Sequence, residues 1–432
     1  MLCISSSLRS ICVQMYEFIN KKSLTFAIDL FVMLMFRNII NTLFTKFSSA
    51  LLSFATVVLI SRVLGSAGKG EQAIVVYNIY LLMLLFTLVG NSTLVYLAPR
   101  QHNGSLLRIS LLWVFASAFV VLLPFVFMGS EAPMFIFESI LIAVLAATGE
   151  INQFLLLGKE KVKQANLVKL LYPLISFGYL GVLHCFSALN SVSDCIVAML
   201  AGYGMSAVCG CVYLKDDYKQ IFARNNSNSQ PLFSTLFKLG ATKQLGSITQ
   251  SLNYRLSFYV LGFYCGESMV GIYSNGVSIG EAVMLFGSSL ALVQYSKLSN
   301  TENHSQSKRL TNRMCLINGG VTLLALLFFD FLPAEVYCFV FGDDFDRVRD
   351  VMRMLSIGIL FLSISSNFTQ YLFAKGNFKT TTLASLLGLG VTLIGCFGLV
   401  PRYGISGAAI TACVSYCVSF LVEFVVYLRC QK

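Results

Sequence analysis

Charged residues are scarce in this chain: Asp, Glu, Lys and Arg make up 12% of its 432 residues, whereas 56% are hydrophobic. A soluble protein of this length could not bury so much apolar surface. Apolar runs of about 20 residues recur along the sequence, and each can cross about 30 Å of hydrocarbon. The sequence therefore predicts an all-α polytopic membrane protein. Its net charge of +11 then reflects basic membrane loops and predicts no nucleic-acid partner.

The sequence also lacks the residue sets of a metal, redox or catalytic site. Its three histidines lie far apart, and its 13 cysteines include no CxxC pair. Scattered cysteines inside apolar runs are typical of small packing residues. The acidic residues from Asp343 to Asp350 are interleaved with Arg347 and Arg349, which is typical of a solvated turn. We therefore expect no enzymatic activity, no metal and no cofactor.

One glycine-rich stretch, Ile60–Glu71 (ISRVLGSAGKGE), ends an apolar run and opens another. A phosphate-binding loop would have to follow a strand in a soluble βαβ unit, and that context is absent. The glycines instead allow a tight turn between helix ends, with Arg62 and Lys69 expected where the chain leaves lipid. A weaker copy, Val260–Gly262 followed by Gly271–Asn275, recurs later in the chain and predicts two related halves.

Twelve apolar segments predict membrane spans. They lie at about residues 43–63, 73–98, 106–128, 134–157, 166–186, 195–214, 238–263, 269–294, 313–332, 350–373, 380–400 and 404–428. A polar, Asn- and Ser-rich segment at 215–237 predicts a flexible cytoplasmic linker. The predicted domains are a leader (1–35), an N-terminal six-helix lobe (36–214), this linker, and a C-terminal six-helix lobe (238–432). Paired lobes are a common transporter plan, with the substrate held between them.

Basic residues decide the predicted orientation. Of the 31 Lys and Arg residues, 22 fall in connections on one side of the predicted membrane and five on the other. Cytoplasmic loops carry an excess of Lys and Arg, so the richer side is placed in the cytoplasm. Both termini are therefore predicted to be cytoplasmic.

Reporter fusions after residues 163, 190 and 225 test this topology. Because Lys161 and the 215–237 linker are predicted inside and Asp194 outside, we expect cytoplasmic, periplasmic and cytoplasmic signals in that order. Alkaline phosphatase and a fluorescent protein, active on opposite sides, check each position independently. A periplasmic signal at residue 225 would overturn the two-lobe assignment.

The first 34 residues are expected to be an over-long start or a tail without function. The apolar run Leu24–Phe36 contains Asp29 and is too short to span a membrane. It also lacks the small-residue cleavage site of a signal peptide. Met33 or Met35 would be a natural start, because the first predicted span follows shortly afterwards.

Five short motifs occur in a recognisable order. They are Leu64–Gly65 with Gly70, Leu252–Arg255 with Leu261–Gly262, Val270–Tyr273, Phe341–Phe345 and Pro401–Thr411. In these motifs the chain resembles the polysaccharide-transporter branch of the MOP flippase superfamily, over about residues 36–429, and within it the Wzx-type O-antigen flippases. Members of that branch often carry an aspartate at the position held here by Ser257. Any role of that acidic partner does not carry over to this chain.

The resemblance implies a V-shaped, MATE-like pair of six-helix lobes that alternate between facing inward and outward. It implies transport of an undecaprenyl-diphosphate-linked oligosaccharide, an O-antigen or related surface-polysaccharide repeat unit, from the cytoplasmic to the periplasmic leaflet of the bacterial inner membrane. Membrane lipid, a polysaccharide polymerase and a chain-length regulator are the implied partners. A cation-coupled multidrug exporter of the same superfamily is the alternative, which acidic residues such as Glu150 and Glu281 would suit.

A lipid-linked sugar would need a polar, cationic cleft, and charged residues inside membrane segments usually line such cavities. At 100° per residue, the polar residues of segment 238–263 fall on one stripe and the apolar residues on the opposite side. That stripe predicts either a substrate cavity or hydrogen bonds that hold helices together. Lys46 lies near a helix end, where its side chain can also reach the membrane surface. The candidate substrate-binding residues are Arg255, Lys243, Gln250, Tyr254, Asn253, Glu281, Ser278, Glu150, Asn152, Lys46 and Arg62.

Arg255 is the candidate contact for the diphosphate. A guanidinium group suits phosphate oxygens because it donates hydrogen bonds in pairs. An unpaired arginine inside a membrane costs roughly 2.5–3.5 kcal/mol or more, so Arg255 needs a partner when the site is empty. Since Ser257 supplies no carboxylate, Glu281 on the next predicted span is the nearest counter-ion by sequence.

Overall fold

The computed structural model describes residues 2–129, 133–222, 229–299 and 304–429. Within these ranges it describes side chains from Asn41 onward. The exceptions are the side chains of residues 222, 229–231, 242, 243, 292, 296, 299, 304 and 378. All regular structure in these ranges is helical. The helices are α1 (Leu2–Phe86), α2 (Thr93–Leu97), α3 (Asn103–Met128), α4 (Ile136–Gly158), α5 (Val162–Cys185), α6 (Val192–Tyr213), α7 (Lys215–Lys219), α8 (Ser229–Cys265), α9 (Glu267–Ser299), α10 (His304–Phe331), α11 (Ala334–Phe341), α12 (Val348–Ala374) and α13 (Phe378–Arg429). Short 3₁₀ turns cover Gln220–Phe222 and Asp343–Phe345. The predicted all-helical class is confirmed.

Two of the helices are too long for a single crossing. Within the described residues, nine helices are long and apolar enough to span a membrane, and two of these cover 46 residues (Asn41–Phe86) and 51 residues (Lys379–Arg429). At 1.5 Å per residue these are about 69 Å and 76 Å long, more than twice the hydrocarbon thickness. Each folds back at one glycine with positive φ, Gly65 in α1 and Gly404 in α13. With α8, which is 37 residues long, the described helices agree with about twelve crossings.

The predicted span at 73–98 is interrupted in the structure. The second arm of α1 ends at Phe86, and a turn precedes the short α2. Asn91 stabilises this turn because its Oδ1 accepts from the Thr93 N–H at 3.0 Å. The end of α1 also receives a partner from the other half of the chain, since Gln244 Nε2 on α8 donates to the Leu84 carbonyl at 2.7 Å. The helix therefore stops where α8 packs against it.

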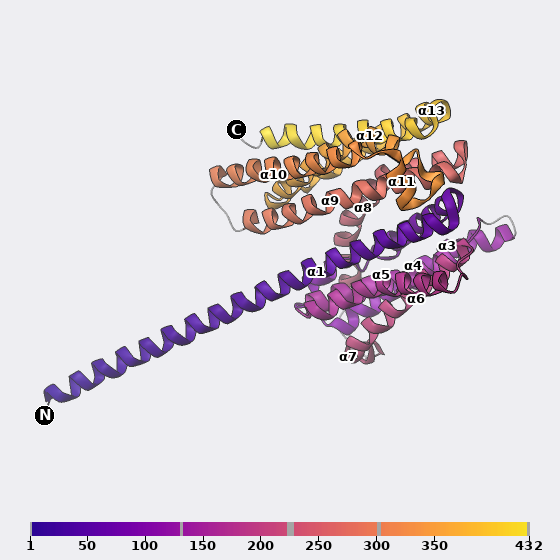
Figure 1. Cartoon of the computed structure of the whole chain (residues 1–432). Helices are drawn as coiled ribbons and strands as arrows, with labels where there is room; N and C mark the ends of the chain where they lie inside the picture. The colour runs from indigo at the N-terminus through magenta and orange to yellow at the C-terminus, as the bar shows by residue number, and fades with distance from the viewer. Residues whose placement is uncertain (1, 130–132, 223–228, 300–303, 430–432) are drawn as a thin grey trace.

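The helices form two groups, visible in Figure 1 as a magenta group and an orange-to-yellow group. One buried apolar cluster contains Leu106, Ile142 and Leu155 of the first group. A second contains Tyr273 and Met352 of the later helices. Helices α1 and α8 contribute to both clusters, so these two helices connect the groups.

The segment predicted as a flexible linker is helical where the structure describes it. Residues 215–222 form α7 and a 3₁₀ turn, and α8 already begins at Ser229. Lys159 Nζ pairs with Asp217 of α7 at 2.6 Å, which holds α7 against the first group. The rings of Phe233 and Phe237 on α8 pack on Trp113 of α3. A polar composition therefore does not make this connection independent of the lobes.

We call the two ends of the bundle the Gly65 end and the linker end. The Gly65 end carries the folds at Gly65 and Gly404 together with α11, and the C-terminus lies at the opposite, linker end (Figure 1). The first part of α1 extends far beyond the bundle at the linker end (Figure 1). By the charge count the linker end is predicted to be cytoplasmic.

Candidate functional site

Arg255 and Glu281 form an ion pair between α8 and α9. Arg255 Nη2 donates to Glu281 Oε1 at 2.5 Å, and the guanidinium carbon lies 5.1 Å from the centre of the Phe258 ring. The side chains are 26% and 53% exposed, respectively. The two groups thus neutralise each other, and part of each side chain stays exposed. An ionic ligand can therefore reach them.

The first lobe also brings a buried cation near this pair. Lys69 is 4% exposed, and its Nζ donates to Gln72 Oε1 at 2.7 Å. It lies within electrostatic range of both Arg255 and Glu281. The sequence predicts Lys69 where the chain leaves lipid, and the structure buries its side chain within the protein. The second arm of α1 begins directly after Gly65, so Lys69 falls on its first turn and faces the packed interior.

Tyr80 connects the charged residues of the two lobes. This α1 side chain is 43% exposed and lies within electrostatic range of Glu150 on α4 as well as of Arg255 and Glu281. Tyr80 therefore lies near charged residues of both lobes. The sequence pattern did not identify Tyr80, because a single tyrosine in an apolar run carries no periodic signal.

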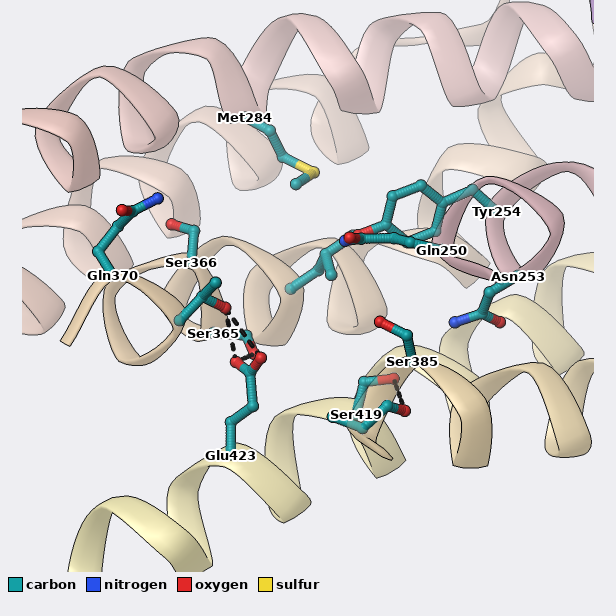
Figure 2. A pocket seen from close by; sticks show the side chains of 13 residues that line it. Gln250, Asn253, Tyr254, Met284, Ser365, Ser366, Gln370, Ser385, Ser419 and Glu423 are labelled. Carbon is teal, nitrogen blue, oxygen red and sulfur yellow. Dashed lines mark hydrogen bonds between the residues drawn. The ribbon is translucent and has the colours of Figure 1, made fainter. Parts of the chain in front are cut away.

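A polar cavity of about 220 Å³ lies beside this pair, within the second lobe. Its wall includes Gln250 and Tyr254, both predicted, and Glu423, which was not (Figure 2). The Glu423 side chain is 5% exposed, and its carboxylate accepts from Ser365 Oγ at 2.5 Å and Thr369 Oγ1 at 2.9 Å. Glu423 could have been noticed as the one acidic residue within the last predicted span.

Two predicted site residues hold helices in place in this structure, and a third bonds within its own helix. Asn253 Oδ1 accepts from Thr392 Oγ1 at 2.5 Å and Ser415 Oγ at 2.6 Å, which joins α8 to both arms of α13. Asn152 is fully buried, accepts from Tyr218 Oη at 3.0 Å and packs α4 against α6. Ser278 donates to a carbonyl of its own helix. Interhelical hydrogen bonding is therefore the role that the geometry supports for Asn253 and Asn152.

The remaining predicted residues lie apart from the Arg255–Glu281 pair. Arg62 donates to the Phe339 carbonyl, stacks over the Phe339 ring and lines a separate cavity at the Gly65 end, on the α11 side. Lys46 is half-buried on the first arm of α1. Lys243 lies on α8, and its side chain is outside the described residues.

Asn253→Ala should lower stability rather than the transport rate of each molecule. The substitution leaves the hydroxyls of Thr392 and Ser415 without their acceptor, and interhelical hydrogen bonds in membranes are worth about 0.6 kcal/mol on average. We expect a loss of about 1 kcal/mol in unfolding free energy for the two bonds, read from chemical denaturation of the purified protein in micelles. Thr249→Ala is the control, because its hydroxyl bonds only to its own helix. Equal stability of the two variants would contradict the structural role.

The two lobes meet closely at the Gly65 end. A Cβ on Gly70 would lie 1.8 Å from the Glu267 carbonyl oxygen, and one on Gly271 would lie 2.0 Å from that of Ser66. Ser66 Oγ and Ser268 Oγ are 2.6 Å apart. Only glycine allows the two backbones to approach this closely. This end of the space between the lobes is closed by backbone contact.

The lobes also touch toward the linker end. Asn91 Nδ2 donates to the Gly240 carbonyl at 3.2 Å, and a Cβ on Gly240 would lie 2.0 Å from the Leu88 carbonyl oxygen. Further along α8, Tyr77 Oη donates to the Ser251 carbonyl at 2.8 Å. Helices α8 and α9 of the second lobe thus both contact the first lobe.

Solved structures with this arrangement are known transporters. The lipid II flippase MurJ in an inward closed conformation superposes with a TM-score of 0.72 and 16% identity, over 90% of this chain and 87% of that chain. A multidrug resistance MATE family transporter of the MOP superfamily, in its inward-facing conformation, gives 0.70 and 15% identity, over 89% and 94%. The chain has the MOP-superfamily fold. The resemblance predicted from its sequence is confirmed.

Sequence relatives of this MOP-fold chain carry names from surface-polysaccharide biology. The capsular polysaccharide biosynthesis protein CapF of Staphylococcus aureus is 23% identical over 327 residues, which is 74% of this chain and 79% of that protein. A putative O-antigen transporter of Shigella flexneri is 20% identical over 255 residues, 59% of this chain and 60% of that protein. No protein-family model matches the chain. The chain is a multi-pass membrane protein, and its relatives are named for capsular polysaccharide biosynthesis and putative O-antigen transport.

Proposed function

We propose that this protein is a flippase for an oligosaccharide linked through a diphosphate to a polyprenyl lipid. It carries this cargo, an O-antigen or related repeat unit, from the cytoplasmic to the periplasmic leaflet of a bacterial inner membrane, with both termini in the cytoplasm. The names of the relatives CapF and the putative O-antigen transporter support this cargo class. The observation that carries the proposal is the accessible Arg255–Glu281 pair on helices predicted to lie in the membrane.

The charge balance of the site suits a diphosphate. With the site empty, Glu281 neutralises Arg255, which avoids an unpaired charge in the membrane. A diphosphate brings two or more negative charges and accepts paired hydrogen bonds from the guanidinium better than a single carboxylate does. Lys69, within electrostatic range, adds a second positive charge from the other lobe. Cargo binding would therefore exchange one anionic partner of Arg255 for another and draw on cations from both lobes.

The contacts between the lobes suit alternating access. Closure at the Gly65 end rests on backbone approach at Gly70 and Gly271 and on a few hydrogen bonds, including that between Ser66 and Ser268. Opening this end would also change the packing of α1 in the second apolar cluster, which includes Ala73. The cargo would enter from the linker end and leave when the Gly65 end opens. A polysaccharide polymerase and a chain-length regulator would then act on the exported unit.

Deletion of the gene and complementation test the proposal. Without the protein, the lipid-linked oligosaccharide should accumulate on the cytoplasmic leaflet while surface polysaccharide disappears. The wild-type gene should restore both, and a strain unable to make the lipid-linked sugar controls for indirect effects on the cell surface. Normal surface polysaccharide in the deletion strain, with unchanged lipid-linked intermediates, would refute the proposal.

The same strains distinguish a flippase from the alternative, a multidrug exporter. A drug exporter should lower the accumulation of lipophilic cations such as ethidium, and its acidic residues should be free to bind them. In this structure Glu281 is already paired with Arg255, which disfavours a cationic substrate. We expect ethidium accumulation to be equal in the deletion and wild-type strains. A difference that follows expression level would favour the exporter instead.

A further inference from the structure

The polar cavity of the second lobe has a composition unlike that of an ordinary helix interface. Its wall combines amides, hydroxyls and one carboxylate from α8, α12 and α13 with apolar surface that includes Met284, Leu362 and Ala384. The lining residues are Gln250, Asn253, Tyr254, Met284, Leu362, Ser365, Ser366, Thr369, Gln370, Ala384, Ser385, Ser419 and Glu423. In Figure 2 these side chains surround one open space.

Two polar groups of this wall have no protein partner. Neither the Ser385 hydroxyl nor the Gln370 amide makes a hydrogen bond to any described residue, although both line the cavity. A polar group inside a membrane protein that lacks a partner is costly unless water or a ligand satisfies it. Glu423 and Ser365 form a fixed acceptor and donor between them. The cavity therefore offers donors and acceptors to a polar, uncharged molecule.

The charges of the wall decide which polar molecules fit. None of the 13 described lining residues is basic, and Glu423 contributes a carboxylate. A ligand carboxylate would therefore lie beside a second carboxyl group in a medium of low dielectric constant, without a cation to offset its charge. A lone inorganic cation would leave most of the 220 Å³ unfilled. A hydroxyl-rich ring with neutral or amino substituents fills the cavity better than a lone cation does and brings no carboxylate near Glu423.

The cavity lies next to a smaller one that contains Glu281, the partner of Arg255. Tyr254, Met284 and Leu362 line both this cavity and a smaller one that contains Glu281. Gln250 precedes Arg255 by five residues on α8, which places it about 7.5 Å nearer the linker end. The Tyr254 ring, set edge-on to Tyr416 at 5.4 Å, adds an aromatic surface of the kind that packs against the C–H groups of a sugar ring.

We propose that this cavity is a monosaccharide subsite that accepts a neutral or amino sugar of the cargo and rejects an acidic one. Gln250, Gln370 and Ser385 hydrogen-bond the sugar hydroxyls, and Glu423 accepts from a hydroxyl or an ammonium group. Glu423 then also determines specificity, because it repels a uronic acid at this position. The inference deepens the proposed function, since it concerns the sugar next to the diphosphate contact.

Saturation-transfer NMR on the purified full chain in nanodiscs tests the subsite with defined probes. The probes are methyl β-glucoside, methyl N-acetyl-β-glucosaminide and methyl β-glucuronide. We expect wild-type protein to give signals from the first two and little from the glucuronide. Ser385→Phe, which fills the cavity, should abolish the neutral-sugar signals. Glu423→Gln, which removes the charge but keeps an acceptor, should raise glucuronide binding relative to glucoside about tenfold, equivalent to about 1.4 kcal/mol.

The controls separate this inference from the flippase proposal. Ser288→Phe, at an exposed position of α9 outside the cavity, should bind as the wild type does. Absence of neutral-glycoside signals in the wild type, or equal signals in Ser385→Phe, would overturn the subsite. The two proposals can also fail separately. If the purified protein binds glycosides but deletion of its gene leaves lipid-linked sugars unchanged, the flippase proposal is refuted and the subsite proposal is not.

Discussion

Replacing Arg255 by alanine should reduce export per membrane-inserted molecule by roughly ten- to a hundredfold. Hydrogen bonds to charged groups contribute about 1.5–3 kcal/mol, which corresponds to that range. Arg255→Lys should recover only part of the loss, because an ammonium group cannot donate the paired hydrogen bonds of a guanidinium. The measurement is surface polysaccharide in a complemented deletion strain, divided by the amount of protein in the inner membrane.

The ion pair requires a second variant to interpret this result. Arg255→Ala leaves Glu281 without its 2.5 Å partner, so the variant protein could also be less abundant. Glu281→Gln removes the unpaired charge, and the double variant Arg255→Ala with Glu281→Gln should regain abundance while export stays low. If the double variant regains export as well, Arg255 serves only to join α8 and α9. Normal export per molecule in Arg255→Ala alone would likewise exclude a contact with the cargo.

Gly271→Val should lower export by roughly five- to 150-fold without unfolding either lobe. Any Cβ at this position meets the Ser66 carbonyl oxygen at 2.0 Å, so the two lobes cannot close at the Gly65 end. Overpacking of this kind costs typically about 1–3 kcal/mol, which shifts the population of the closed state by roughly five- to 150-fold. Because transport by alternating access needs this state in each cycle, the export rate should fall in proportion.

Cysteine crosslinking measures the closure directly. Ser66→Cys with Ser268→Cys, in a chain without its other cysteines, places two thiols where the serine oxygens are 2.6 Å apart. We expect an efficient disulfide in this background and a much weaker one after Gly271→Val. Gly398→Val is the matched control, since no heavy atom lies within 4 Å of its added Cβ. Full export and undiminished crosslinking in Gly271→Val would show that closure at this end is dispensable.

Much of the fold was predictable because the membrane imposes local rules. Hydrocarbon thickness sets the length of each apolar run, so the crossings could be counted from the sequence alone. Glycine placement marked the folds at Gly65 and Gly404, where a residue with positive φ is required. A guanidinium inside such a run needs a partner, and Arg255 with Glu281 satisfied that rule on consecutive long helices.

The remaining features of the site depend on how the helices are rotated and tilted against one another. Lys69 became an interior residue because α1 resumes directly after Gly65, and Asn253 proved to join α8 to Thr392 and Ser415, well over a hundred residues away. Glu423 acquired its cavity only when α13 packed beside α12. A hydrophobic period reports which face of a helix is polar. It does not report which other helix that face meets, because that choice is made by close packing between segments distant in the chain.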